Sequence, residues 1–211
     1  MAHPIHVLPV RERAAVINRV LKQRLETVLP AAMAASGIDM WLILCHEDNL
    51  DPVFTTLIPM DTWCPILQVI VFYDRGPGPD GVHQIERINI SGTNTHDLYD
   101  RPYRGQLEVE QWPILLRTIQ ERNPQRIGIN IGPVQWAASG LTHNLYTQLT
   151  NRLPAKYVDR LVSAEPLATA WLSTLSEEEV TLYEHVAAVA HAIIARCYSR
   201  ATLVPGVTTA E

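Results

Sequence analysis

Two short segments of this chain are almost entirely apolar, and they constrain the fold more than any other feature. Residues 39–45 read DMWLILC, and residues 66–73 read ILQVIVFY. A strand that is apolar on both faces has to be covered on both faces, as in proteins whose sheet lies between helices. Neither segment approaches the roughly 20 apolar residues that a membrane-spanning helix needs. The chain is therefore predicted to be an α/β protein without a membrane span.

Helical periodicity surrounds these strands. Apolar residues recur every three or four positions over residues 10–29, which predicts a helix that Pro30 should break or restart and a short continuation that Gly37 should cap. The turn-forming stretch 76–81 predicts an antiparallel hairpin between residues 66–73 and 82–91, with the second strand nearer an edge because polar residues alternate along it. Further helices are predicted over 110–123, 139–153 and 165–173, and further strands over 126–131 and 157–163. This alternation predicts a mixed β-sheet flanked by helices.

A long helix is predicted over residues 177–201. Ser176 and Glu179 have the spacing of a capping box, and the apolar stripe of the helix is wide enough to need cover on more than one side. Thr208 and Glu211 repeat the pattern that opens a helix, after a stop at Pro205. We therefore expect residues 1–173 to form one α/β domain and residues 174–211 to be a linker helix and the start of a second, truncated domain. A polar tail that matches the pattern by chance is the alternative.

The charge and the cysteines exclude some classes of protein. Lys and Arg number 17 against 22 Asp and Glu, a net charge of −5 without a basic run, so a nucleic-acid protein held by phosphate contacts is not expected. The first residues lack the basic and apolar blocks of a signal peptide. Cys45, Cys64 and Cys197 are an odd number without CxxC spacing, which is typical of reduced thiols. These features predict a cytoplasmic protein.

Few residues are candidates for chemistry. The sequence contains no HExxH, CxxC, GxSxG or GxGxxG pattern. The densest group of potential ligands is His46-Glu47-Asp48, which follows the first buried strand, although such a run is more often a solvated turn. Residues 100–105 carry two arginines that could bind an acidic group, or they could form an ordered connection. The residues alone do not predict a self-sufficient active site.

Several segments, in order along nearly the whole chain, carry a resemblance to a known family. They are residues 37–43 (GIDMWLI), 45–52 (CHEDNLDP), 126–130 (RIGIN), 161–167 (LVSAEPL), 176–179 (SEEE) and 205–209 (PGVTT). Together they resemble the N-terminal domain of the creatinase/prolidase/aminopeptidase P family, in a subgroup similar to Xaa-Pro peptidases. The resemblance implies a ribonuclease H-like α/β domain, followed by one long helix that would lead into a pita-bread catalytic domain that is missing here.

The resemblance also implies a function for the domain. The family's peptidases hydrolyse their substrates at a two-metal site of Mn, Co or Zn, although creatinase lacks metal, and all the ligands belong to the catalytic domain. No catalytic and no metal-binding residue is therefore expected in this chain. The N-terminal domain of the family contributes to dimers and walls the substrate cleft, which implies a homodimer, a peptide substrate of the full-length protein, and His46, Asn49 and Phe54 as cleft-facing residues. His46 could contact a substrate carboxylate near neutral pH.

Two other hypotheses remain open at this point. The chain could be a stand-alone binding or oligomerisation module that never had a catalytic half. It could also be a small self-contained hydrolase that uses His46, Glu47 and Asp48 with an unrecognised partner. The substrate of the parent protein is open as well, because Xaa-Pro dipeptides, longer Xaa-Pro peptides and creatine-like amidines all occur within such a family.

Overall fold

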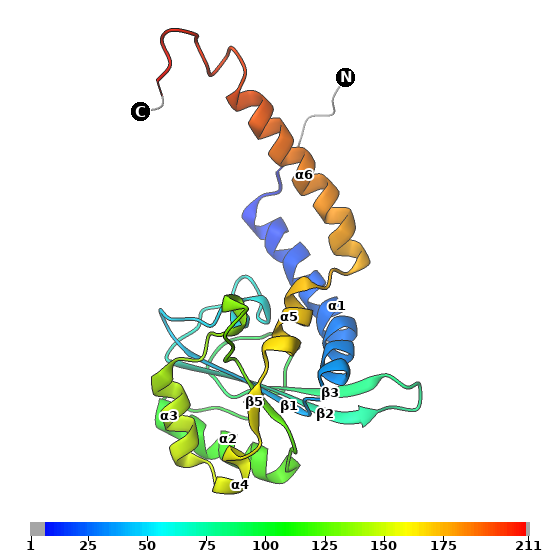
Figure 1. Cartoon of the computed structure of the whole chain (residues 1–211), viewed down its shortest axis with the longest axis vertical. Helices are drawn as coiled ribbons and strands as arrows, with labels where there is room; N and C mark the ends of the chain where they lie inside the picture. The colour runs from blue at the N-terminus through cyan, green and yellow to red at the C-terminus, as the bar shows by residue number, and fades with distance from the viewer. Residues whose placement is uncertain (1–6, 210–211) are drawn as a thin grey trace.

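A five-stranded mixed sheet forms the centre of the molecule (Figure 1). Its strands, in the order β3-β2-β1-β4-β5, are β1 (Met40–His46), β2 (Leu67–Pro77), β3 (His83–Asn89), β4 (Ile127–Ile129) and β5 (Leu161–Ser163). β2 pairs antiparallel with β1 and β3, whereas β4 pairs parallel with β1 and β5. The structure is a computed structural model and describes residues 7–209. The predicted hairpin and the place of its second strand at an edge are confirmed.

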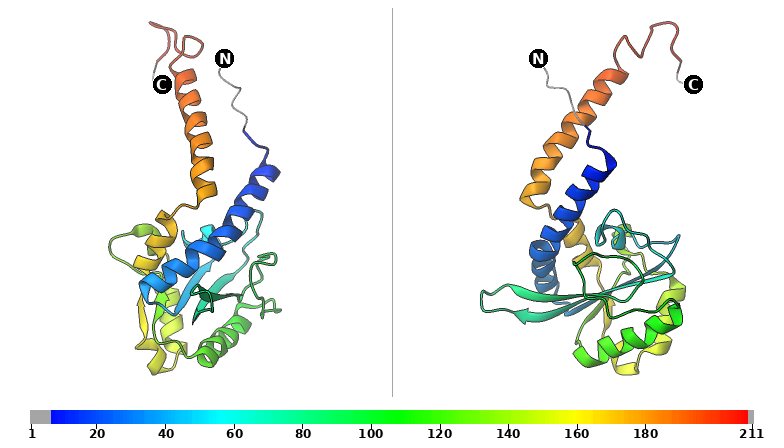
Figure 2. Two further views of the ribbon diagram at one scale, coloured as in Figure 1. Left: turned by 90° about the vertical axis from the view of Figure 1, so that its right-hand side faces the viewer. Right: turned by 180° about the vertical axis from the view of Figure 1, so that it is seen from behind.

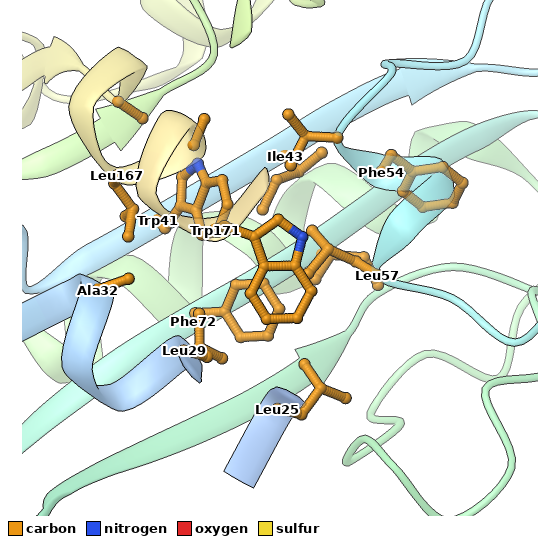
Figure 3. Packing of buried hydrophobic residues seen from close by; sticks show 14 of the residues in the cluster. Leu25, Leu29, Ala32, Trp41, Ile43, Phe54, Leu57, Phe72, Leu167 and Trp171 are labelled. Carbon is orange, nitrogen blue, oxygen red and sulfur yellow. The ribbon is translucent and has the colours of Figure 1, made fainter. Parts of the chain in front are cut away.

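Helices cover both faces of the sheet and enclose two hydrophobic cores. α1 (Val10–Ser36) and α5 (Glu165–Ser173) lie on one face, and α2 (Glu108–Arg122), α3 (His143–Arg152) and the short α4 (Ala155–Val158) lie on the other (Figure 1). Successive side chains of β1 alternate between the cores: Trp41 and Ile43 pack with α1 and α5 (Figure 3), and Leu42 and Leu44 pack with α2 and α3. The prediction of strands buried on both faces is confirmed.

Pro30 does not break α1, contrary to the expectation from the sequence. The helix is continuous from Val10 to Ser36 and contains Pro30. Proline removes one backbone hydrogen bond from a helix interior. Leu29 and Met33, which lie before and after Pro30, are fully buried in the core between α1 and the sheet, so tertiary packing holds both parts of the helix in line. Gly37 ends α1 with φ of 62°, and its predicted role as a cap is confirmed.

Other element boundaries differ from the expectation by a few residues. α3 begins at His143 rather than at residue 139, because the side chain of Thr142 caps it by accepting a hydrogen bond from the backbone N–H of Leu145. The start of the predicted strand 157–163 belongs instead to α4 and the turn after it, so that only β5 remains. Two short 3-10 helices, η1 (Phe54–Thr56) and η2 (Trp136–Ala138), lie in segments for which the sequence predicted neither a helix nor a strand.

The last helix, α6 (Glu177–Cys197), leaves the α/β body and rises beside the N-terminal half of α1 (Figures 1 and 2). Its predicted capping box is confirmed: Ser176 Oγ accepts from the Glu179 N–H, and Glu179 Oε2 accepts from the Ser176 N–H at 2.8 Å. α6 ends at Cys197, four residues earlier than expected. Glu211 lies outside the described residues, so the second helix start predicted at Thr208 is not described.

α6 has no buried residue, in keeping with the wide stripe that the sequence predicted. Its exposed apolar side chains are Val180, Tyr183, Val186, Ile193 and Ile194, with Tyr198 just beyond. Across residues 7–209, none of the helices combines the length and the apolar character that crossing a membrane requires.

Candidate functional site

The candidate site lies at the carboxyl ends of β1, β4 and β5. These three strands run parallel, so the residues that follow them meet at one edge, which is where α/β proteins often bind ligands. The chain places His46 at the end of β1, Asn130 directly after β4, and Glu165 two residues after β5. The loop after β1 therefore carries the candidate residues predicted from the sequence.

His46 and Asn49 lie together in a tight turn at this edge. The Asn49 N–H donates to the carbonyl oxygen of His46 at 3.1 Å, and Asp48 adopts a left-handed conformation with φ of 63° between them. His46 is half-buried, and its Nε2 lies 3.3 Å from Oε2 of Glu108, the first residue of α2. Asn49 is exposed. The imidazole is thus oriented by a carboxylate while part of the turn faces solvent.

Glu47 is tied to the start of β2. Its carboxylate accepts from the Ile66 N–H at 3.2 Å, and its own N–H donates to the Ile66 carbonyl at 2.9 Å. Within residues 7–209, no three His, Cys, Asp or Glu side chains come together as a group that could hold a metal ion. His46-Glu47-Asp48 therefore does not form such a group.

Phe54 occupies a different environment from His46 and Asn49. It lies in η1 and is fully buried in the core between the sheet, α1 and α5, beside Leu57 (Figure 3). This burial gives Phe54 a packing role beneath the loop, and it does not favour contact between the ring and a substrate.

A buried polar network supports the same loop, and sequence reasoning missed it. Trp41 Nε1 donates to Asn130 Oδ1 at 2.7 Å, and Asn130 Nδ2 donates to Asp51 Oδ2 at 2.9 Å. Asp51 Oδ1 accepts from the N–H groups of Val53 and Phe54. Burial raises the pKa of Asp51, although the hydrogen bonds from Asn130 and from the two backbone groups act in the opposite direction. The network connects the loop after β1 with the end of β4.

Close packing at Gly140 confirms how tightly this carboxylate is enclosed. A Cβ atom at position 140 would overlap the side chain of Asp51. The signal that could have revealed the network is a polar residue, Asn130, at the end of a strand whose other residues are apolar and buried. Asp51, by contrast, lies in a loop without periodicity, and its burial could not be read from its neighbours.

The two cysteines near the site are buried thiols. Burial raises the pKa of Cys45 to about 12 and also raises the pKa of Cys64. A thiol that does not ionise near neutral pH is a poor nucleophile. Cys45 and Cys64 are therefore packing residues.

The arginine-containing loop over residues 100–105 is an ordered connection. Tyr99 and Tyr103, the two aromatic residues around it, are buried, and their hydroxyl groups donate to the carbonyl oxygens of Leu57 and Leu107. Burial raises the pKa of Tyr99. Arg104 Nη1 donates to the backbone of Tyr103 at 3.0 Å. Of the two interpretations that the sequence left open, the loop geometry favours the structural one.

The fold is similar to that of a solved structure. The chain is similar to an Xaa-Pro dipeptidase from Bacillus anthracis, with a TM-score of 0.51 and 14% sequence identity. The fold resembles the prolidase N-terminal region. The match covers 90% of this chain and 45% of the dipeptidase, so the chain spans less than half the length of that protein. No family model and no curated protein match the sequence. The predicted fold class is confirmed, and the likeness is one of fold.

Proposed function

We propose that this chain is the non-catalytic N-terminal domain of an Xaa-Pro aminopeptidase- or dipeptidase-like metallopeptidase, in which it walls the substrate cleft and takes part in dimerisation. The observation that carries the proposal is the match to the dipeptidase, which accounts for 90% of this chain and leaves more than half of the other protein without a counterpart. In this proposal residues 1–173 form the domain, and residues 174–211 lead into a catalytic domain that holds Mn, Co or Zn.

His46 and Asn49 are the residues that we propose to face the cleft. Both lie on the turn after β1, Asn49 is exposed, and the imidazole of His46 is held beside the carboxylate of Glu108. An imidazole N–H in this position would donate a hydrogen bond to the carboxylate of a peptide substrate. Phe54 enters the proposal only as packing beneath this turn, because its ring is fully buried.

The exposed face of α6 supports a role in a larger assembly. A contiguous apolar surface on a folded protein usually marks an interaction site. In the proposed protein the catalytic domain covers this face. The same surface is the observation that favours the alternative, a stand-alone binding or oligomerisation module in which α6 packs across a symmetric dimer.

Calorimetric titration of the purified chain with Mn²⁺, Co²⁺ and Zn²⁺, with an Xaa-Pro dipeptide in the same buffer, tests the assignment of chemistry. We expect neither stoichiometric metal binding nor hydrolysis. Stoichiometric metal binding with turnover would contradict the proposal. It would indicate an active site in the loop that carries His46 and Asp48.

Reading the encoding gene beyond codon 211 separates the two remaining candidates. A continuing frame with the Asp, His and Glu ligands of a two-metal site supports the proposed N-terminal domain. A stop codon shortly after codon 211 supports the stand-alone module instead.

A further inference from the structure

The apolar packing of α6 against the α/β body is sparse. No residue of α6 is buried. Between α6 and the N-terminal half of α1 lies an open cleft of about 410 Å³, whose walls are apolar side chains of both helices, including Val16, Ile17, Val186 and Ile193. Helices usually owe their orientation to interlocking side chains, but the apolar residues of α6 on this side, such as Leu182 and Val189, are only partly buried.

The first turn of α6 is held instead by one buried guanidinium. Arg24, in the middle of α1, is 8% exposed. Its Nη1 donates to the carbonyl oxygen of Thr174 at 2.6 Å and to Oε2 of Glu179 at 2.7 Å, and its Nη2 donates to the carbonyl oxygen of Trp171. The guanidinium carbon lies 4.4 Å from the centre of the Trp171 ring. A single side chain therefore contacts α5, the linker and α6.

The charges of Arg24 and Glu179 match the helix ends at which they lie. The carbonyl of Trp171 belongs to the last turn of α5, where backbone acceptors lack partners within the helix and a cation is favoured. Glu179 lies in the first turn of α6, where an anion is favoured. The planar fork of arginine serves both ends at once, which a lysine ammonium cannot do with the same geometry.

One oxygen atom joins the start of α6 to this contact. Oε2 of Glu179 accepts from the backbone N–H of Ser176 in the capping box and from Arg24. The residue that completes the capping box of α6 is thus also the residue that binds the helix to α1. A second, more exposed pair, Arg19 with Glu178, lies on the same side.

We propose that Arg24 and Glu179 are positioning residues that set the angle between α6 and the α/β body. Loss of either side chain leaves α6 helical and the body folded, but lets α6 swing about the linker over residues 174–176. If the proposed function holds, the same contact sets the angle at which the chain enters the catalytic domain; the inference itself concerns only the described residues and does not depend on that function.

The distance between α1 and α6 is the quantity that tests this inference. Spin labels on Arg11→Cys and on the native, exposed Cys197 report it by pulsed electron paramagnetic resonance, since Cys45 and Cys64 are buried. Labelled protein is diluted with unlabelled protein to suppress distances between molecules. We expect a narrow distribution for the parent and, because a hinge is released, a distribution roughly twice as wide for R24Q and for E179Q.

Lys22→Gln is the matched control, because Lys22 is exposed on α1 two residues from Arg24 and the substitution removes the same charge. The R24Q/E179Q double variant should be no broader than the wider single variant, as expected for two residues that act through one contact. Near-UV circular dichroism checks that the body stays folded; if R24Q does not fold, E179Q decides. Widths of R24Q and E179Q equal to that of K22Q would overturn the inference.

Discussion

At the scale of single residues, the most informative side chains are polar ones that the fold has buried. The Trp41–Asn130–Asp51 network leaves each of its donors and acceptors paired, which is the condition under which polar groups are tolerated in a core. Removing its middle member leaves the Trp41 indole N–H and one carboxylate oxygen of Asp51 without their hydrogen-bond partner. The cost then comes from desolvation without compensation rather than from the lost bonds alone.

We predict that Asn130→Leu lowers the free energy of unfolding by about 2–4 kcal/mol, because both the Trp41 indole N–H and Oδ2 of Asp51 lose their partner. Urea denaturation followed by circular dichroism measures the change. Asn49→Ala, at an exposed position in the nearby turn, is the control, and its effect should stay within about 0.5 kcal/mol. Equal effects of the two substitutions would show that the network does not support the fold.

The thiols allow a second prediction at this scale. Cys197 is exposed, whereas Cys45 and Cys64 are buried with raised pKa values. A chromogenic disulfide reagent at neutral pH should therefore modify one of the three cysteines rapidly, and the other two only after denaturant is added. Rapid reaction of two or three thiols in the native protein would contradict the buried placement of Cys45 and Cys64.

At the scale of elements, helix α6 shows how far local signals reach. Its N-terminus could be predicted to the residue, because a capping box is complete within four positions. Its attachment to α1 could not, because it depends on Arg24, 155 residues away from Glu179 in sequence. A signal for Arg24 was present: it lies three residues after Leu21 and four before Val28, on the apolar stripe of α1. An arginine on such a stripe needs a buried partner.

The pH dependence of stability tests this attachment. Burial acts to raise the pKa of Glu179, but the hydrogen bonds from Ser176 and Arg24 outweigh it, so the pKa in the folded chain is lowered from 4.5. The carboxylate therefore contributes stability that is present above pH 4.5 and is lost as the pH falls towards the lowered value.

We expect E179Q to be less stable than the parent at neutral pH by about 1 kcal/mol or less, as for partly exposed ion pairs. The difference should shrink as the pH falls below 4.5 and through the lowered pKa of Glu179, because the parent carboxylate then becomes neutral as well. Urea titrations across this range measure it. Glu177→Gln, in the same turn, is the control, and a similar pH-dependent difference in that variant would assign the effect to the helix terminus in general.

At the scale of the whole molecule, the apolar surface of the sheet is covered but that of α6 is not. The sheet is covered on both faces, but α6 projects from the body with its apolar side exposed (Figure 2). Such a surface favours association of isolated chains or exchange of the helix between them. The sequence predicted this surplus of apolar surface, and the fold confirms that the described domain does not cover it.

We predict that the 211-residue chain self-associates with rising concentration, and that the variant V186E/I193E shifts the equilibrium towards monomer because it places charges in the apolar face. Sedimentation velocity over a wide concentration range measures the distribution of species. Val82→Glu is the control, because Val82 is similarly exposed but lies in the β2–β3 hairpin turn. A monodisperse monomer of the parent at every concentration would refute the prediction.

What the sequence determined by itself is the set of features that depend on near neighbours. Apolar runs, turn residues and capping patterns act within a few positions, and they were sufficient for the α/β class, the β2–β3 hairpin and the starts of α5 and α6. Tertiary structure decided the rest. It kept α1 continuous through Pro30, buried Phe54, brought Asp51 to Asn130 across 79 residues, and joined Arg24 to Glu179. These outcomes depend on which surfaces meet when the layers pack, and pairwise contacts between distant segments leave no periodic signal along the chain.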